Sequence, residues 1–221
     1  MLVQDIMQHP VITIAPDATI DAAYRRMHDE QIRHLPVVAP SDGVVGVVTD
    51  RDLRHATSDL HPSPIEAKSP VRDAMTEHPI TAGPLDPVED VARILRTKSI
   101  GCLPVLDGAD LVGIITVTNL LDAVIRLTGL HKPGARLAVS LSDEPGQLGA
   151  LATRVAEAGL DIRSVLSYYE DEVEPLLESP SAADGSRLRV ILRLDTIDIR
   201  PLANALRDEG FDVVWPVPKP V

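Results

Sequence analysis

The chain contains two copies of one sequence pattern, and this internal repeat limits its possible folds more than any other feature. A shift that carries Met7 onto Met75 aligns the copies without a gap as far as Val105, and deleting one residue extends the match. The paired positions are Val3/Val71, Asp5/Asp73, Ile12/Ile80, Thr13/Thr81, Pro16/Pro84, Ile32/Ile100, Leu35/Leu103, Pro36/Pro104, Gly46/Gly113, Thr49/Thr116 and Asp52/Asn119. Because each copy is too short to bury much of a core alone, we expect the two copies to pack together.

Each copy is predicted to fold in the order β-α-β-β-α. In the first copy, a short apolar strand at residues 12–14 precedes a helix with apolar residues at the i, i+3, i+4, i+7 spacing of one helical face: Ile20, Ala23, Tyr24 and Met27. Two strands at 35–39 and 44–49 follow, joined by a turn of Pro, Ser, Asp and Gly. The second copy predicts strands at 103–106 and 111–116 and a closing helix near 120–125.

Charge and composition exclude nucleic acids as partners. The 221 residues include 21 Lys and Arg against 33 Asp and Glu, which gives a formal net charge of −12, and aromatic residues are only 2% of the chain. An acidic chain repels a phosphate backbone, and few rings are available to stack on bases, so we expect no DNA or RNA partner. A single bound nucleotide is still compatible with this charge, because it needs only a few local cations.

The remaining composition predicts a cytoplasmic protein that does not cross a membrane. Cys102 is the only cysteine, so no intrachain disulfide can form. No apolar stretch is long enough to span a bilayer, and the first ten residues carry no Lys or Arg, unlike a secretory signal.

The most specific motif lies at the end of the last strand in each copy. It reads Gly46-Val47-Val48-Thr49-Asp50-Arg51-Asp52 in the first copy and Gly113-Ile114-Ile115-Thr116-Val117-Thr118-Asn119 in the second. A Leu-Pro-Val strand opening comes before it, after Arg33-His34 in one copy and Gly101-Cys102 in the other. On these motifs, residues 1–127 resemble a tandem pair of CBS domains, also called a Bateman module.

The Thr and Asp/Asn residues of this motif have two possible roles. A short carboxylate or amide can accept hydrogen bonds from both ribose hydroxyls, and free N–H groups at a strand-to-helix junction suit an anion. The same side chains can instead cap the helices that follow. Because the motif occurs twice in the same context, we predict nucleotide contact.

The resemblance to CBS pairs implies two clefts, each combining residues from both copies. One cleft would contain Thr116, Asn119, Thr13, Ile32, Arg33 and His34. The other would contain Thr49, Asp52, Thr81, Ile100, Gly101 and Cys102, with charge available only from Arg51 and Arg54. We therefore expect the Arg33/His34 cleft to prefer a phosphorylated adenosine, since Arg binds phosphate strongly. Thr13 and Thr81 also fit buried β-branched strand positions, and Cys102 fits a small buried apolar residue.

The C-terminal third follows a different pattern. Strands predicted at 137–141, 161–168, 187–194 and 211–215 and two intervening helices give the order βαββαβ of a ferredoxin-like fold. This segment resembles an ACT domain, a regulatory module that often dimerises and binds small effectors. The resemblance rests on residues 143–148 and 158–162 and implies an effector site at Asp143, Pro145, Gly146 and Asp161. An ionised Asp161 donates no hydrogen bond and repels a carboxylate, which argues against an amino acid there.

These patterns predict an α+β protein with three domains. The CBS units would occupy residues 1–60 and 71–127, the linkers 61–70 and 128–135, the ACT domain 136–217 and a stiff Pro-rich tail 218–221. The acidic run at 170–174 is interpreted as a solvated loop; alternatively it neutralises the arginines of strand 187–194 or contacts a basic partner.

The predicted function is that of a non-catalytic regulator. The CBS pair would bind AMP, ADP, ATP or S-adenosylmethionine, and the ACT domain would dimerise or bind a second effector. The arrangement resembles acetoin-utilisation B-type regulatory proteins and implies a homodimer and a metabolic enzyme as partner, with no catalytic cofactor and no metal. The alternatives are a ligand-free scaffold for dimerisation and an enzyme, although no nucleophile–base or metal-ligand pattern supports the latter.

Overall fold

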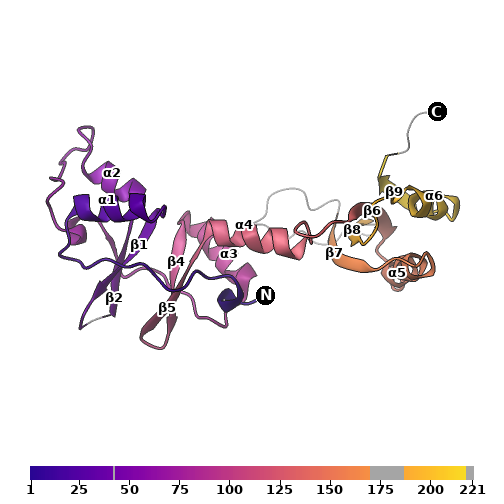
Figure 1. The fold of residues 1–221 in the computed structure, drawn as a ribbon, viewed down its shortest axis with the longest axis horizontal. Helices are drawn as coiled ribbons and strands as arrows, with labels where there is room; N and C mark the ends of the chain where they lie inside the picture. Colours follow the sequence, from indigo (N-terminus) through magenta and orange to yellow (C-terminus); the bar gives the residue numbers. More distant parts are fainter. Residues whose placement is uncertain (42, 170–186, 218–221) are drawn as a thin grey trace. The chain divides into compact units, whose positions relative to one another are not determined.

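A computed structural model of the protein describes residues 1–41, 43–169 and 187–217 (Figure 1). The chain forms two compact units, Met1–Ala123 and Val124–Val221. Asp42 of the first predicted turn, the acidic run at 170–174 and the tail at 218–221 lie outside the described residues. Within the described part of the chain, no helix combines the length and the apolar character that crossing a bilayer requires.

The N-terminal unit has two similar halves, each with a helix, an antiparallel strand pair and a second helix. The first half comprises α1 (Ile20–Asp29), β1 (His34–Ala39), β2 (Gly43–Thr49) and α2 (Asp50–Ala56). The second half comprises α3 (Val88–Lys98), β4 (Cys102–Asp107), β5 (Asp110–Thr116) and α4 (Val117–Leu127). These elements confirm the predicted helix-strand-strand-helix order of both copies.

The predicted strand at 12–14 is wrong. Only Ile14 forms a bridge, a single parallel one to Val37, and Ala82 forms the equivalent bridge to Val105. Pro16 follows two residues later and has no backbone N–H to continue a ladder. The segment therefore makes two hydrogen bonds to β1, Ile14 N to Pro36 O and Val38 N to Ile14 O, and then turns away.

The segment that leads into each half packs on the other half. The 3-10 helix η1 (Val3–Asp5) lies beside α3, where Val3 N donates to Asp86 O (Figure 1). Its counterpart η2 (Val71–Asp73) packs in the first half, and the short strand β3 (Thr76–Glu77) pairs with β2. Accordingly Val3 and Ile6 belong to the core of the second half. Val71 belongs to the core of the first half.

The motif glycines make this exchange of segments possible. A Cβ atom on Gly113 would lie 2.3 Å from the Met7 sulfur, and one on Gly46 would lie 2.6 Å from the Met75 sulfur. A methionine of the exchanged segment thus occupies the space that a side chain at either glycine would need. A larger residue at either glycine would require the methionine side chain to move.

A small apolar cluster joins the two strand pairs. Val47 of β2, Cys102 of β4 and Ile114 of β5 are buried against one another, with Val11 packed beside them. Because Val47 and Ile114 occupy equivalent motif positions, the cluster lies between the equivalent ends of the two halves. The polar residues that follow on each chain segment are thereby brought to the junction.

The C-terminal unit contains β6 (Ala135–Ser142), α5 (Gln147–Glu157), β7 (Ile162–Tyr169), β8 (Arg187–Leu194), α6 (Arg200–Asp208) and β9 (Asp212–Trp215). This is the predicted βαββαβ order. The strands form one antiparallel sheet in the order β7-β8-β6-β9. Both helices cover one face of the sheet, where Leu151 and Leu206 join the alternate apolar residues of β6 and β8 in a single core.

The arginines of β8 lie on the opposite face of this sheet, because side chains alternate between the two faces along a strand. Arg187 donates from Nε to Ser140 Oγ at 2.8 Å and forms an ion pair with Asp212 at 2.7 Å. Arg193 donates to the backbone oxygen of Lys132 at 3.4 Å. Arg187 therefore connects β8 to β6 and β9, and Arg193 connects β8 to the segment before β6.

We expect Val3→Ala to destabilise the N-terminal unit, because Val3 is fully buried in the core of the opposite half. Loss of two buried methyl groups should lower the free energy of unfolding by about 2 kcal/mol. The thermal midpoint should then fall by roughly 4–8 °C. Leu85→Ala, at a side chain that is 67% exposed, is the matched control and should change stability little. Equal midpoints for the two variants would contradict the exchanged packing.

Candidate functional site

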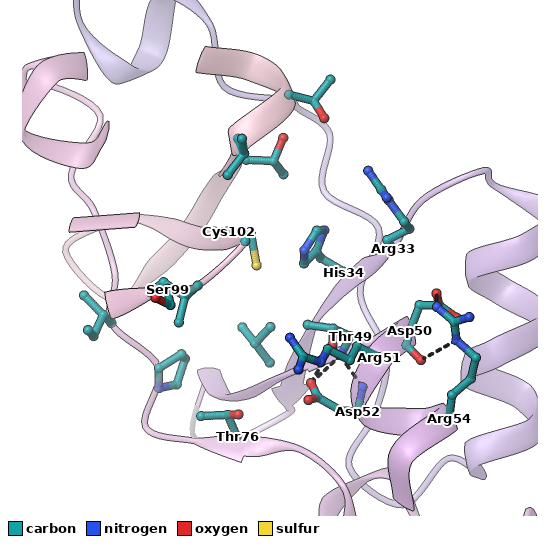
Figure 2. A pocket seen from close by; sticks show the side chains of 18 of the residues that line it. Arg33, His34, Thr49, Asp50, Arg51, Asp52, Arg54, Thr76, Ser99 and Cys102 are labelled. Atoms are coloured by element: carbon teal, nitrogen blue, oxygen red, sulfur yellow. Dashed lines mark hydrogen bonds and ion pairs between the residues drawn. The ribbon is translucent and has the colours of Figure 1, made fainter. Parts of the chain in front are cut away.

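A cavity of about 720 Å³ lies between the two halves of the N-terminal unit (Figure 2). Residues from both copies line it: Arg33, His34, Val47, Thr49, Asp50, Arg51, Asp52, Arg54, Thr76, His78, Pro79, Ile80, Ser99, Ile100, Gly101, Cys102, Thr116, Val117 and Thr118. Its volume falls within the 300–1,000 Å³ range of small-molecule sites. One wall carries Thr49, Arg51 and Asp52, while Ser99 and Cys102 come from the other half (Figure 2).

Thr49 and Asp52 form a reciprocal cap at the start of α2. Asp52 Oδ2 accepts from Thr49 N at 3.0 Å and from Thr49 Oγ1 at 2.7 Å, and Asp52 N donates to Thr49 Oγ1 at 3.1 Å. The helix-cap interpretation is therefore correct for these residues. The cap also holds the Asp52 carboxylate rigidly at the cavity wall, so it does not conflict with ligand contact.

Thr116 and Asn119 repeat this cap at the start of α4. Asn119 Oδ1 accepts from Thr116 N at 2.9 Å and from Thr116 Oγ1 at 2.7 Å. The two residues line a second cavity of about 190 Å³ with Gln8, Ile12, Gln31, Ile32, Arg33, His34, Ile114 and Thr118. The structure thus brings together Thr116, Asn119, Ile32, Arg33 and His34 in one cleft, and Thr49, Asp52, Ile100, Gly101 and Cys102 in the other.

The residues before each Leu-Pro-Val strand are shared unequally between the two cavities. Gly101 and Cys102 line only the larger cavity, whereas Arg33 and His34 line both. A Cβ atom on Gly101 would lie 2.5 Å from His34 Nε2. The His34 ring therefore lies against the backbone of Gly101, at the boundary of the two cavities.

Thr13 and Thr81 do not line either of these two cavities. Both side chains are exposed, so the expectation that they are buried strand residues is also wrong. The preceding residues, Ile12 and Ile80, line the smaller and the larger cavity, respectively. Because these segments are not regular strands, side-chain alternation along the sequence did not identify which residue faces inward.

The expectation that only one cleft carries Arg33 and His34 is wrong. Both residues line both cavities. The larger cavity holds three arginines and two aspartates, and Arg54 forms an ion pair with Asp50. Arg33 and Arg51 therefore face this cavity together with Asp52, and the balance of charge favours an anionic group.

Burial lowers the pKa of His34 below its ordinary value of 6.5, and the positive charge of Arg33 acts in the same direction. The negative charge of Asp52 opposes the shift. His34 is therefore a neutral imidazole at pH 7 and can both donate and accept a hydrogen bond.

Cys102 is a buried, protonated thiol. Burial raises its pKa to about 12, and the nearby charge of Asp52 adds to the effect. Because the thiolate is the reactive form, this cysteine contributes a small apolar surface to the cavity.

Several lining residues were not singled out from the sequence. Thr76 and Gln8 occupy equivalent positions of the two copies. Thr76 lines the larger cavity and Gln8 lines the smaller one. The repeat alignment could have identified this pair once either residue was known to face a cleft. His78 and Ser99 line the larger cavity but follow no recognisable motif.

The candidate effector residues of the C-terminal unit lie on its surface. Asp143, Pro145 and Gly146 are exposed in the loop before α5, and Gly146 adopts a positive φ of 96° at the helix start. Asp161 is exposed as well, and its backbone N donates to Asp195 Oδ1 at 2.8 Å. The Asp195 carboxylate therefore already occupies the backbone N–H of Asp161. Among the described residues, no group of three or more His, Cys, Asp or Glu could hold a metal ion.

Stability should depend on pH through His34. The unfolded chain takes up a proton near pH 6.5, whereas the folded chain does so at lower pH, so stability is lost as the pH falls from 7 through 6.5 towards the folded pKa. We expect wild type to lose more of its free energy of unfolding than His34→Gln between pH 7 and pH 5, measured by urea denaturation. Parallel pH profiles for the two proteins would contradict this.

The comparisons with known proteins concern the region that holds these cavities. A CBS domain-containing protein of Dictyostelium discoideum is 35% identical over 135 residues, which covers 58% of this chain and 93% of that protein. The homoserine O-acetyltransferase of Methanohalobium evestigatum is 34% identical over 120 residues, 53% of this chain but only 23% of the enzyme. The second match is therefore confined to a part of a longer protein.

Solved structures match the same region. A CBS domain pair in complex with 5′-methylthioadenosine and S-adenosyl-L-methionine has a TM-score of 0.51 at 30% identity, covering 60% of this chain and 98% of that one. A putative acetoin utilization protein from Vibrio cholerae has a TM-score of 0.51 at 29% identity, with the same coverages. CBSX2 in complex with AMP has a TM-score of 0.50 at 28% identity, covering 57% of this chain and 96% of that one.

The family model of the CBS domain matches residues 3–59 and 71–126, which together make up just over half of the chain. These two stretches correspond to the two repeat copies, with their duplicated motif and shared core. The chain is a member of the CBS-domain family and contains a tandem pair of CBS domains.

Proposed function

We propose that this protein is a non-catalytic regulator whose CBS pair binds one adenosine-containing ligand, of the AMP, ADP, ATP or S-adenosylmethionine type, in the larger cavity. The observation that carries the proposal is the 720 Å³ cavity that combines the capped Asp52 carboxylate with arginines and an apolar wall. Val47, Ile80 and Ile100 offer surface to a base, Asp52 accepts from ribose hydroxyls, and Arg33 and Arg51 attract an anionic group.

The related structures support this ligand class. CBS pairs solved with 5′-methylthioadenosine, S-adenosyl-L-methionine and AMP share the fold of this region. Each of these molecules contains adenosine. The smaller cavity, at 190 Å³, falls below the usual size of such sites, which supports one ligand per chain.

A regulator also needs two states that bind the ligand differently. The larger cavity takes residues from both halves, so a bound ligand would bridge them and favour one mutual orientation. In the matched homoserine O-acetyltransferase, the similar region forms a minor part of an enzyme. This supports a metabolic enzyme as the regulated partner.

The matched pair Asp52→Asn and Asn119→Ala tests the choice of cavity. Asparagine at position 52 can keep the cap, as Asn119 does in the other half, but it removes the carboxylate. Loss of a hydrogen bond to a charged group costs about 1.5–3 kcal/mol, so Asp52→Asn should weaken AMP binding by roughly 10–100-fold in isothermal titration calorimetry. Asn119→Ala should leave the affinity within about twofold, and wild type should bind one AMP per chain.

The reverse pattern, with binding lost in Asn119→Ala, would move the site to the smaller cavity. If adenosine, AMP, ADP, ATP and S-adenosylmethionine all fail to bind folded wild-type protein, the regulator proposal is wrong. The ligand-free scaffold would then be the better description.

We further propose that the C-terminal unit is an ACT domain and that the protein is a homodimer. The βαββαβ order and the sheet order β7-β8-β6-β9 support the ACT assignment. The negative charge of Asp161 and of Asp195, whose carboxylate accepts from the Asp161 backbone N, disfavours the carboxylate of an amino-acid effector, which leaves dimerisation as the principal role of this unit. Helix α4 adds an exposed apolar stripe at Val117, Leu121 and Val124, spaced for one helical face.

The α4 stripe predicts the effect of a charge on assembly. Wild type should sediment as a dimer, and Leu121→Glu should shift it towards monomer at micromolar concentration, because a buried charge has no partner in an apolar contact. Ile197→Glu, at a side chain that is 98% exposed, should leave the dimer intact. A Leu121→Glu protein that sediments as wild type would exclude α4 from the interface, and a monomeric wild type would exclude the homodimer.

A further inference from the structure

A third cavity, lined mainly by basic side chains, lies along helix α2 next to the 720 Å³ cleft. It measures about 340 Å³ and is lined by Arg51, Arg54, His55, Ser58, Leu60 and His61. Five of these six residues carry a polar side chain that can donate a hydrogen bond, and none is a carboxylate. A cavity with this lining suits an anion with several oxygens.

The histidines of this cavity hold each other in place. The rings of His55 and His61 meet edge to face, with centroids 4.9 Å apart and an interplanar angle of 84°. His61 Nδ1 accepts from the backbone N of Ser63 at 3.1 Å. The proton of a neutral His61 therefore resides on Nε2, which makes that atom a hydrogen-bond donor.

Ser58 is also held so that its hydroxyl group can donate a hydrogen bond. Ser58 Oγ accepts from the backbone N of Leu60 at 3.2 Å. Its hydroxyl hydrogen remains available to donate to an oxygen in the cavity. The turn after α2 thus presents donors from both Ser58 and His61.

The two arginines connect this cavity to the cleft, because Arg51 and Arg54 line both. Arg54 is anchored by its ion pair with Asp50 and by a bond from Nε to the Asp50 carbonyl at 3.4 Å. Figure 2 shows Arg51 beside Thr49 and Asp52, with the paired Asp50 and Arg54 next to them. A phosphate chain that leaves the ribose position at Asp52 would meet Arg51 before it reaches the histidines.

Helix stability alone explains only part of this cluster. Arg54 and His55 lie in the last turn of α2, where a positive charge complements the helix dipole. Arg51 lies in the first turn, where that effect is unfavourable, and His61 lies beyond the helix. The helix dipole therefore does not explain why Arg51 and His61 line the same cavity.

We propose that this cavity is an anion subsite for the outer phosphates of the ligand, so that the cleft selects a nucleoside di- or triphosphate over adenosine and AMP. The inference rests on the proposed function, since the base and ribose occupy the cleft at Asp52. The subsite would provide the selectivity for ATP over AMP. AMP would occupy only the cleft, whereas the β- and γ-phosphates of ATP would extend past Arg51 to His55, Ser58 and His61.

The test compares adenosine, AMP, ATP and inorganic tripolyphosphate by calorimetry on wild type and on the double variant His55→Gln/His61→Gln. Both histidines line the 340 Å³ cavity along α2 and do not line the 720 Å³ cavity. We expect ATP and tripolyphosphate affinities to fall about tenfold or more in the double variant, while AMP affinity stays within twofold. His28→Gln, at an exposed histidine of α1, is the matched control and should leave all affinities unchanged.

Unchanged ATP affinity in a folded double variant would overturn the subsite, and so would a wild type that binds AMP and ATP equally. If adenosine and AMP fail to bind wild type while tripolyphosphate binds and is lost in the double variant, the subsite stands and the adenosine proposal falls. Tripolyphosphate binding is therefore the measurement that separates the two proposals.

Discussion

The N-terminal unit depends on the contact between a methionine of each leading segment and a motif glycine of the opposite strand pair. Met7 lies against Gly113 and Met75 against Gly46, so close that a Cβ atom at either glycine would require the methionine side chain to move. The same segments bury Val3 and Val71 in the opposite cores. Neither half has a complete core without the segment from the other, and this requirement fixes how the two strand pairs face each other.

The cavities follow from that arrangement. Once Val47 and Ile114 meet at the centre, the capped starts of α2 and α4 lie on either side of the junction. Each capped pair then faces the residues that precede the Leu-Pro-Val strand of the other half. The reciprocal hydrogen bonds of Thr49 with Asp52 hold a carboxylate in position without a ligand, so the same bonds serve the helix and the site.

The two halves of the N-terminal unit share one backbone fold, but the side chains that line the two cavities differ. Gly101 and Cys102 line only the larger cavity, whereas Arg33 and His34 line both, and the His34 ring lies against the backbone of Gly101. A duplicated fold thereby acquires one large cleft and one small one. Positive charge is also concentrated on the large side, because Arg51 and Arg54 of the first copy correspond to Thr118 and Leu121 in the second.

The sequence by itself determined the repeat, the helix-strand-strand-helix order of each copy, the βαββαβ order of the C-terminal unit and the residues that cap α2 and α4, because these depend on local spacing and on hydrogen bonds within a few residues. Of the predicted cleft residues, all but Thr13 and Thr81 line at least one of the two cavities, and their contact with a ligand stays a prediction. Only the tertiary structure decided that Ile12 and Ile80 face inward, that Arg33 and His34 border both cavities, and that the cavities differ in volume. Those properties depend on how far a side chain reaches across a junction between distant segments, and neither periodicity nor motif spacing carries that information.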